Sequence, residues 1–160
     1  MNIAIFASGS GTNAENIIQY FQQQKTHHVK IVLSNKTDAY VHTRAKQLNV
    51  PSLSFSKNDL ENVSPVQSIL EKNDIDFIVL AGFLLKIPDE IVDQYEGRIL
   101  NIHPALLPNY GGKGMYGDKV HEAVIAAKEK ESGITIHQVN KLYDSGSIVF
   151  QAKCEVKEDD

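Results

Sequence analysis

The stretch NIAIFASGSGTN (residues 2–13) joins a short apolar run to a turn that contains two glycines. The apolar part predicts a buried strand. The SGSGTN part (8–13) predicts a tight turn, and the residues after it predict a helix with Ile17, Ile18 and Phe21 on one face. The stretch therefore predicts the first strand–turn–helix crossing of an α/β fold.

The same alternation of apolar runs and amphipathic segments continues along the chain. Further strands are predicted at residues 29–35, 52–55, 76–82 and 98–103, and helices at residues 39–48, within 59–73 and at 119–130. This order is typical of an α/β fold with a mainly parallel sheet flanked by helices. Near the end, GITIHQV (133–139) and SIVFQAKCEV (147–156) predict two strands joined as an antiparallel hairpin. Residues 104–118 contain two prolines and four glycines and predict a long loop.

The composition is that of an ordinary globular protein, and 160 residues fit one domain. The net charge of −4 and the absence of a basic block argue against nucleic acid as a partner, because Lys and Arg must neutralise its phosphates. The longest apolar run, residues 78–85, is too short to span a bilayer, and no signal peptide is recognised, so no membrane partner is predicted. The single cysteine, Cys154, excludes an intramolecular disulfide. A reducing, cytoplasmic location is expected.

The turn at residues 7–14 is also a candidate anion site. Its glycines allow a sharp turn, and the start of the following helix offers unpaired N–H groups at the positive end of the helix dipole. These features suit a phosphate or a carboxylate. A structural alternative stays open, because Thr12 and Glu15 have the spacing of a capping box and the glycines then serve only the turn.

The same turn matches the dinucleotide fingerprint as Gly9-x-Gly11-x-x-Ala14, although a single match has low specificity. A dinucleotide site also expects an acidic residue at the end of the second strand, where this chain has Ser-Asn-Lys (34–36). The sequence therefore disfavours a dinucleotide cofactor. No group of residues has the spacing of metal ligands, so no metal is predicted.

The stretch ILNIHPALLPNY (99–110) places two polar side chains at the end of a predicted strand. Asn101 and His103 are two residues apart and therefore share a face, at the carboxyl end where open α/β sheets bind ligands. An amide and an imidazole suit acyl or formyl transfer, in which one donates to a developing oxyanion and the other carries a proton. The alternative is that both side chains are hydrogen-bonded polar groups of the core.

Asp144, in KLYDSG, is the candidate carboxylate that orients His103 and favours its charged form. Its alternative role is to form the turn, which for an isolated Asp is the commoner one. His137, in the strand ITIHQV, is predicted to be a structural histidine whose hydrogen bonds are satisfied.

Three features occur together in order along the chain. They are SGSGTN (8–13), AGF…ILNIHPALLP (81–108) and GITIHQV…YDSG (133–146). Together they resemble, over essentially all 160 residues, the formyltransferase family that uses 10-formyltetrahydrofolate. The resemblance implies a Rossmann-like sheet in a single formyltransferase domain over residues 1–160, without the C-terminal helical segment with which the family continues. It also implies that Asn101, His103 and Asp144 are the catalytic residues.

The resemblance further implies two binding segments and a lid. The phosphate of a ribonucleotide substrate would bind at Gly11, Thr12 and Asn13. The folate would bind at Leu84, Leu85, Lys86, Ile87 and Asn101. Residues 104–118 would form a mobile lid.

The implied reaction belongs to de novo purine (IMP) biosynthesis, with 10-formyltetrahydrofolate as co-substrate and no metal. The amine of glycinamide ribonucleotide would attack the formyl carbon, and Asn101 and protonated His103 would stabilise the tetrahedral oxyanion. Asp144 would support His103 and help a proton to reach the leaving N10. The expected partners are these small molecules, without nucleic acid or membrane, and the expected state is a monomer or homodimer.

Alternatives remain within the same chemistry and outside it. A formyltetrahydrofolate hydrolase or another 10-formyltetrahydrofolate-dependent formyltransferase, such as the one acting on methionyl-tRNA, would use the same catalytic set. The glycine-rich turn favours a small phosphorylated substrate, and the acidic charge argues against tRNA. A more distant alternative is a non-catalytic Rossmann-like nucleotide-binding module, in which Asn101, His103 and Asp144 would have no purpose.

Overall fold

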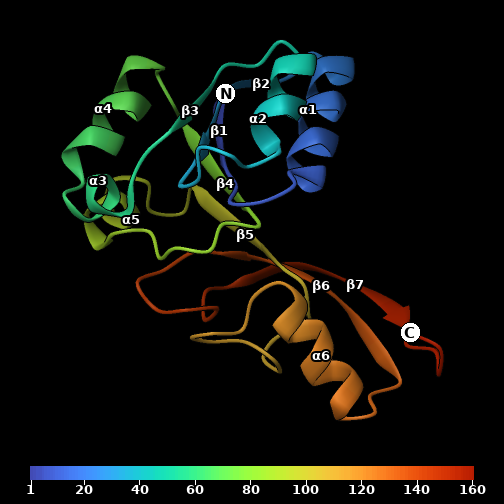
Figure 1. Cartoon of the computed structure of the whole chain (residues 1–160). Helices are drawn as coiled ribbons and strands as arrows, with labels where there is room; N and C mark the ends of the chain where they lie inside the picture. The colour runs from blue at the N-terminus through green and yellow to red at the C-terminus, as the bar shows by residue number, and fades with distance from the viewer. The chain divides into compact units, whose positions relative to one another are not determined.

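The computed structural model describes residues 1–160, which divide into two compact units, residues 1–99 and residues 100–160. Figure 1 shows both units coloured along the chain. None of the helices combines the length and the apolar character that crossing a membrane requires. The expectation that residues 1–160 form a single domain stays a prediction.

The first unit is built on four parallel strands. These are β1 (Asn2–Phe6), β2 (His28–Ser34), β3 (Ser52–Ser54) and β4 (Phe77–Ala81), in the order β3-β2-β1-β4. The predicted strands in this part of the chain are therefore confirmed. Their apolar side chains form the core, where the fully buried ones include Ile5, Phe6, Ile31, Leu33 and Ile78. Strands that are buried on both faces read as continuous apolar runs, which is why the sequence identified them.

Five helices cover the two faces of this parallel sheet. Figure 1 shows α1 (Thr12–Gln24) and α2 (Val41–Gln47) on one side of the strands, and α3 (Lys57–Glu61), α4 (Ser64–Lys72) and α5 (Asp89–Gln94) on the other. The helix predicted within residues 59–73 is α4, which has Pro65 in its first turn, where a missing N–H costs nothing. The helices α3 and α5 were not predicted, because five or six residues are too few to show a helical period.

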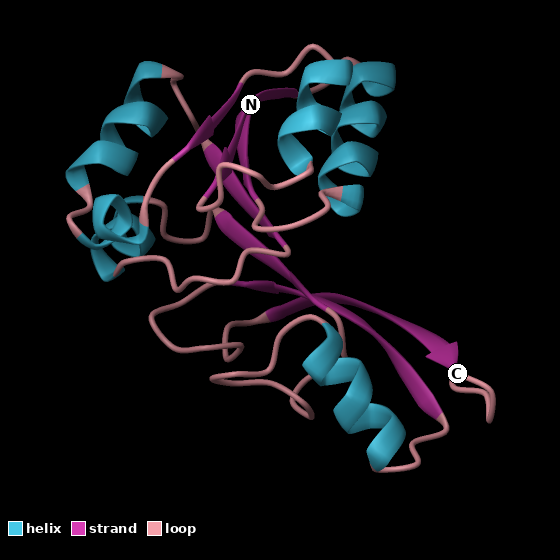
Figure 2. Ribbon diagram, viewed as in Figure 1, coloured by secondary structure: helices cyan, strands magenta, loops and turns pink.

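The second unit contains three antiparallel strands and one helix. The strands β5 (Ile99–His103), β6 (Glu131–Gln138) and β7 (Ile148–Glu155) lie in this order, and α6 (Asp118–Ala126) precedes β6. Figure 2 shows the long β6–β7 ribbon and the loop between β5 and α6, which contains neither helix nor strand. The predicted hairpin and the long loop are confirmed. The antiparallel pairing of β5 with β6 was not predicted.

Candidate active site

Asn101 and His103 of β5 lie in a cluster with His137 of β6 and Asp144 of the β6–β7 connection. The antiparallel register pairs Asn101 with His137 and His103 with Thr135, so these side chains share one face of the sheet. Asn101 Nδ2 lies 3.0 Å from His137 Nε2. Asp144 Oδ1 lies 3.5 Å from both His137 Nε2 and His103 Nδ1. The structure thus brings together the three predicted catalytic residues, and it adds His137 to them.

The buried His103 ring faces a hydrogen-bond acceptor at each nitrogen. Its Nε2 lies 2.7 Å from the carbonyl oxygen of Tyr110, which can only accept, so Nε2 carries a proton. Its Nδ1 faces the Asp144 carboxylate. An imidazolium, with a proton on each nitrogen, satisfies both contacts at once. The geometry therefore suits a histidine that holds and delivers a proton.

His137 connects Asn101 to Asp144. Its Nδ1 donates to the Gln138 carbonyl oxygen at 3.0 Å, so its Nε2 accepts from the Asn101 amide when the ring is neutral. Burial lowers the pKa of His137, but the hydrogen bond to Asp144, the Gln138 carbonyl and the Asp144 charge raise it, and the net pKa lies above its ordinary value. These hydrogen bonds agree with the prediction that His137 is a structural histidine whose nitrogens both have partners. Its contacts with Asn101 and Asp144 go beyond that prediction.

Asp144 remains ionised in this cluster. Burial raises its pKa, but the hydrogen bonds from His137 and from the Gly112 N–H (2.9 Å), together with the charges of His103 and His137, bring the pKa below its ordinary value. Asp144 has a φ of 48°, a left-handed conformation that Asp tolerates well. It therefore forms the turn and faces both histidines, so the two roles considered from the sequence are compatible.

Gly146 of the DSG motif is required for a steric reason. A Cβ added at Gly146 would collide with the carbonyl oxygen of Gln138, whose N–H donates to the Ser147 carbonyl at 2.9 Å. The connection between β6 and β7 can therefore close in this way only around a glycine. This closure holds the turn that carries Asp144.

Thr135 fixes the chain that follows His103. Its hydroxyl donates to the Ala105 carbonyl at 2.7 Å and accepts from the Leu107 N–H at 3.0 Å. Gln151 of β7 donates to this hydroxyl and to the Leu107 carbonyl, both at 2.9 Å. The signal in the sequence is the alternation of Thr135 and His137 with isoleucines in GITIHQV, since polar residues at alternate positions share a face of the strand.

The predicted phosphate-binding residues lie where β1 turns into α1. Gly11 precedes the first helical turn with a φ of 76°, and no side chain caps the helix. The capping box of Thr12 with Glu15 is therefore not formed, and Glu15 instead pairs with Arg44 at 2.6 Å. Thr12 and Asn13 are exposed. Because the first N–H groups of an α-helix have no partner within the helix, the turn can offer them to an anion.

Replacing Gly11 with alanine is expected to damage this turn, whereas replacing Gly9 is not. A Cβ at Gly11 would collide with the side chain of Val41 in α2 and would sit at a strained φ, but a Cβ at Gly9 meets nothing. We expect Gly11→Ala to weaken binding of inorganic phosphate about tenfold or more, the factor that corresponds to about 1.4 kcal/mol of backbone strain. Amide NMR titration of both variants provides the measurement. Equal weakening in Gly9→Ala would contradict the explanation.

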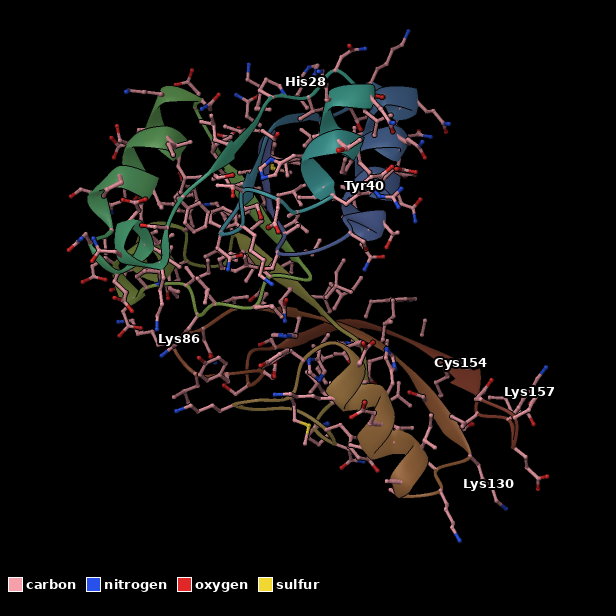
Figure 3. All side chains as sticks on the ribbon, viewed as in Figure 1. His28, Tyr40, Lys86, Lys130, Cys154 and Lys157 are labelled. Carbon is pink, nitrogen blue, oxygen red and sulfur yellow. The ribbon has the colours of Figure 1, made fainter.

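The predicted folate-binding residues lie in the loop between β4 and α5 of the first unit. Leu84 is 39% exposed and Ile87 only 3%, so the loop presents the first side chain and buries the second. The Leu84 N–H donates to Ser8 Oγ at 2.9 Å, and Ser8 Oγ donates to Asn35 Oδ1 at 2.6 Å. Ser8 therefore joins this loop to the start of the glycine-rich turn. Leu85 and Lys86 lie between these residues, with Lys86 on the surface (Figure 3).

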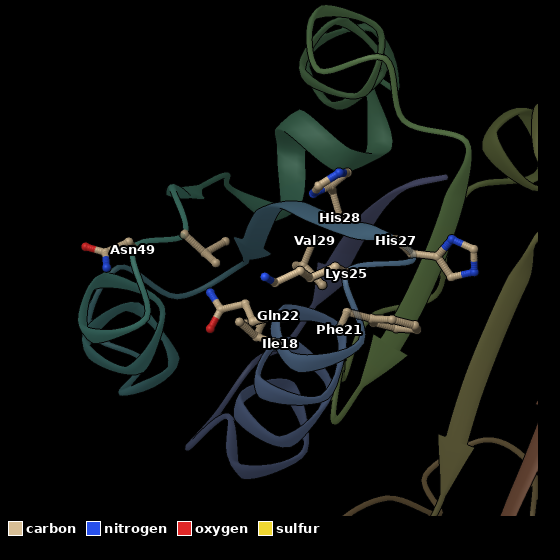
Figure 4. A pocket seen from close by; sticks show the side chains of 9 residues that line it. Ile18, Phe21, Gln22, Lys25, His27, His28, Val29 and Asn49 are labelled. Atoms are coloured by element: carbon tan, nitrogen blue, oxygen red, sulfur yellow. The ribbon is translucent and has the colours of Figure 1, made fainter.

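The first unit also has a cavity of about 390 Å³ between the end of α1 and the start of β2 (Figure 4). Phe21 and Val29 supply apolar lining, and Gln22 and Lys25 supply polar lining. No residue of the predicted catalytic or binding sets lines it. The cavity is therefore separate from the predicted sites.

An α/β sheet that brings an amide, two imidazoles and a carboxylate together has the groups that acyl-group transfer uses, and the comparison with known families gives the class. The family described as formyl transferase matches residues 1–160. The chain therefore belongs to the formyl transferase family.

Similar proteins are named for one member of that family. The chain is 41% identical over 160 residues to the chloroplastic phosphoribosylglycinamide formyltransferase of Arabidopsis thaliana, covering 96% of this chain and 55% of the relative. It is 37% identical over 163 residues to phosphoribosylglycinamide formyltransferase of Haemophilus influenzae, covering 99% and 74%. Glycinamide ribonucleotide transformylase 1 of Symbiobacterium toebii has the same fold, with a TM-score of 0.90, 28% identity and coverage of 100% and 76%. The chain spans about half the length of the plant relatives it matches.

Proposed function

We propose that the protein transfers the formyl group of 10-formyltetrahydrofolate to the amine of glycinamide ribonucleotide, a step of de novo purine (IMP) biosynthesis. The observation that carries the proposal is the cluster of Asn101 and Asp144 with the buried His103 and His137. The names of the similar proteins support the choice of substrates.

In the proposed reaction, the amine nitrogen attacks the formyl carbon, and the carbonyl oxygen of the formyl group gains negative charge. An N–H of Asn101 and a proton on His103 stabilise this oxyanion. Asp144 keeps His103 oriented and offsets the charge of its imidazolium form. The carbon–N10 bond then breaks, N10 receives a proton, and the attacking amine loses one. Neither a metal nor a covalent enzyme intermediate is needed for these steps.

One contact must change before His103 can act. The Nε2 proton of His103 is bound to the Tyr110 carbonyl at 2.7 Å, and the formyl oxygen must replace this carbonyl as the acceptor. Tyr110 belongs to the long loop 104–117, so the proposed exchange requires that loop to move. This is the lid role expected for residues 104–118.

The binding roles follow the same proposal. The N–H groups at Gly11, Thr12 and Asn13 would hold the phosphate of the ribonucleotide, and the loop with Leu84, Leu85, Lys86 and Ile87 would bind the folate together with Asn101. We propose that these small molecules are the partners of a monomer or homodimer. A cytoplasmic location is proposed on the single cysteine, although the Arabidopsis relative is named chloroplastic.

A coupled assay separates the candidate reactions. The protein is incubated with 10-formyltetrahydrofolate, and formation of tetrahydrofolate is followed with glycinamide ribonucleotide, without it, and with glycinamide that lacks the ribose phosphate. We expect turnover only when the complete ribonucleotide is present, with the formyl group recovered on its amine. Turnover at the same rate without any amine would instead support the hydrolase alternative.

A further inference from the structure

The helix α2 holds the glycine-rich turn through two backbone carbonyl groups. The Val41 N–H donates to the Gly9 carbonyl at 3.2 Å, and Arg44 Nε donates to the Ser10 carbonyl at 2.7 Å. In a trans peptide, the carbonyl and the following N–H point in opposite directions. Because both carbonyl groups face α2, the N–H groups of Ser10 and Gly11 face away from it. The contacts with α2 therefore decide which edge of the turn presents donors.

Arg44 is held from three sides. Its Nε donates to the Ser10 carbonyl, its Nη1 donates to Glu15 Oε2 at 2.6 Å, and its guanidinium carbon lies 5.0 Å from the centre of the Tyr40 ring. Figure 3 marks Tyr40 beside α2. The planar guanidinium group can bind a carbonyl, a carboxylate and a ring face together, which an ammonium cannot. One side chain thus joins α2, the turn and α1.

Glu15, the ion-pair partner of Arg44, explains why a positive charge is needed at position 44. Glu15 lies in the first turn of α1, the same turn whose N–H groups would bind an anion. An unpaired carboxylate at this position repels a bound phosphate. The ion pair with Arg44 offsets that repulsion, and both side chains are only 24% and 28% exposed, so solvent screens them incompletely.

We propose that Arg44 is a positioning residue of the phosphate-binding turn. Through the Ser10 carbonyl it aims the N–H groups of the turn at the ligand phosphate, and through Glu15 it removes a repelling charge. Arg44 does not touch the ligand in this proposal. The inference rests on the proposed function for the identity of the phosphate, which is that of glycinamide ribonucleotide.

The test compares Arg44→Met with a matched control. Arg98 donates to two backbone carbonyls, those of Asp76 (3.2 Å) and Gln94 (2.9 Å), and its guanidinium carbon lies 5.2 Å from the centre of the Tyr95 ring. Arg98→Met therefore removes the same charge, contacts with backbone carbonyls and a contact with a tyrosine ring, all away from the turn. We expect Arg44→Met to raise the KM for glycinamide ribonucleotide about tenfold, or about 1.4 kcal/mol, with little change in kcat. Arg98→Met should leave this KM unchanged.

Two further variants separate the two parts of the role. Arg44→Lys keeps a charge for Glu15 but cannot also hold the Ser10 carbonyl, so it should restore only part of the affinity. Adding Glu15→Gln to Arg44→Met removes the unpaired carboxylate and should likewise restore part of the affinity. If Arg44→Met instead lowers kcat with an unchanged KM, or changes KM no more than Arg98→Met, the proposal is wrong.

A second readout does not depend on catalysis. Inorganic phosphate is titrated into wild type and Arg44→Met, and the amide signals of Gly11, Thr12 and Asn13 are followed by NMR. Shifts in wild type that need about tenfold more phosphate in the variant support the positioning role even if no formyl transfer is detected. Wild-type amides that do not respond to phosphate overturn it. Failure of the proposed reaction and failure of this inference therefore give different results.

Discussion

The His103→Ala variant is expected to lose about 10²- to 10⁴-fold in kcat for formyl transfer, which is the usual range for removing a general acid–base group. The ring faces the Asp144 carboxylate on one side and donates to the Tyr110 carbonyl on the other. Without it, no group in the cluster can deliver a proton from this position. The KM values should change little, because the proposed role concerns charge that develops during the reaction. Steady-state kinetics with both substrates provides the measurement.

Two further variants show whether the loss reflects chemistry or folding. His103→Gln can still donate an amide N–H to the Tyr110 carbonyl but cannot release a proton, so it should fold and remain nearly as inactive as the alanine variant. His121→Ala removes an exposed histidine of α6 and should retain wild-type activity. Thermal unfolding of all three identifies any misfolded variant. Near-normal turnover in a folded His103→Gln protein would exclude His103 as the proton carrier.

The Asp144→Asn variant is expected to lower kcat about 10²-fold and to change its pH profile. The amide keeps the shape of the side chain but removes the negative charge that faces both histidines. Burial, which lowers the pKa of His137, then acts without the opposing effect of Asp144, so the pKa of His137 should fall. NMR titration of the histidine rings measures this directly. An unchanged kcat profile and an unchanged His137 titration would remove Asp144 from the catalytic set.

The same variant should alter how stability depends on pH. The pKa of Asp144 is lowered by folding, so its stabilising contribution is present above its ordinary pKa of 3.8 and is lost as the pH falls through the folded value. The pKa of His137 is raised by folding, so its contribution is complete below 6.5 and is lost as the pH rises through the folded value. The pair therefore stabilises the fold most between these two ordinary values. Urea unfolding should show wild type losing free energy of unfolding as the pH rises above 6.5 through the raised pKa of His137, and Asp144→Asn losing less of it.

The strands and the longer helices could be predicted, because buried parallel strands appear as continuous apolar runs and amphipathic helices as a 3.6-residue period. The short helices α3 and α5 could not, since they complete hardly more than one turn. The capping box of Thr12 with Glu15 was a reasonable alternative from spacing alone. Arg44, 29 residues further along the chain, takes the Glu15 carboxylate instead, and such a tertiary contact leaves no local signal.

The grouping of Asn101, His103 and Asp144 was predicted from strand alternation and from the family resemblance, and the structure places the three together in the second unit. The place of His137 in the group was not predicted. It depends on the antiparallel register between β5 and β6, which sets Asn101 opposite His137, and the sequence contains no separate signal for that register. The roles of these residues remain the subject of the variants described above.

The hydroxyl of Ser8 has a consequence for how this protein can evolve or be redesigned. It accepts from the Leu84 N–H and donates to Asn35, so the first residue of the glycine-rich turn also fixes the loop proposed to bind folate. A substitution of Ser8 that is selected for binding a different nucleotide would therefore also disturb the loop that is proposed to bind the folate. The preferences for the nucleotide that accepts the formyl group and for the folate that donates it should therefore change together in laboratory evolution, unless a new hydrogen-bond partner for the Leu84 N–H arises first.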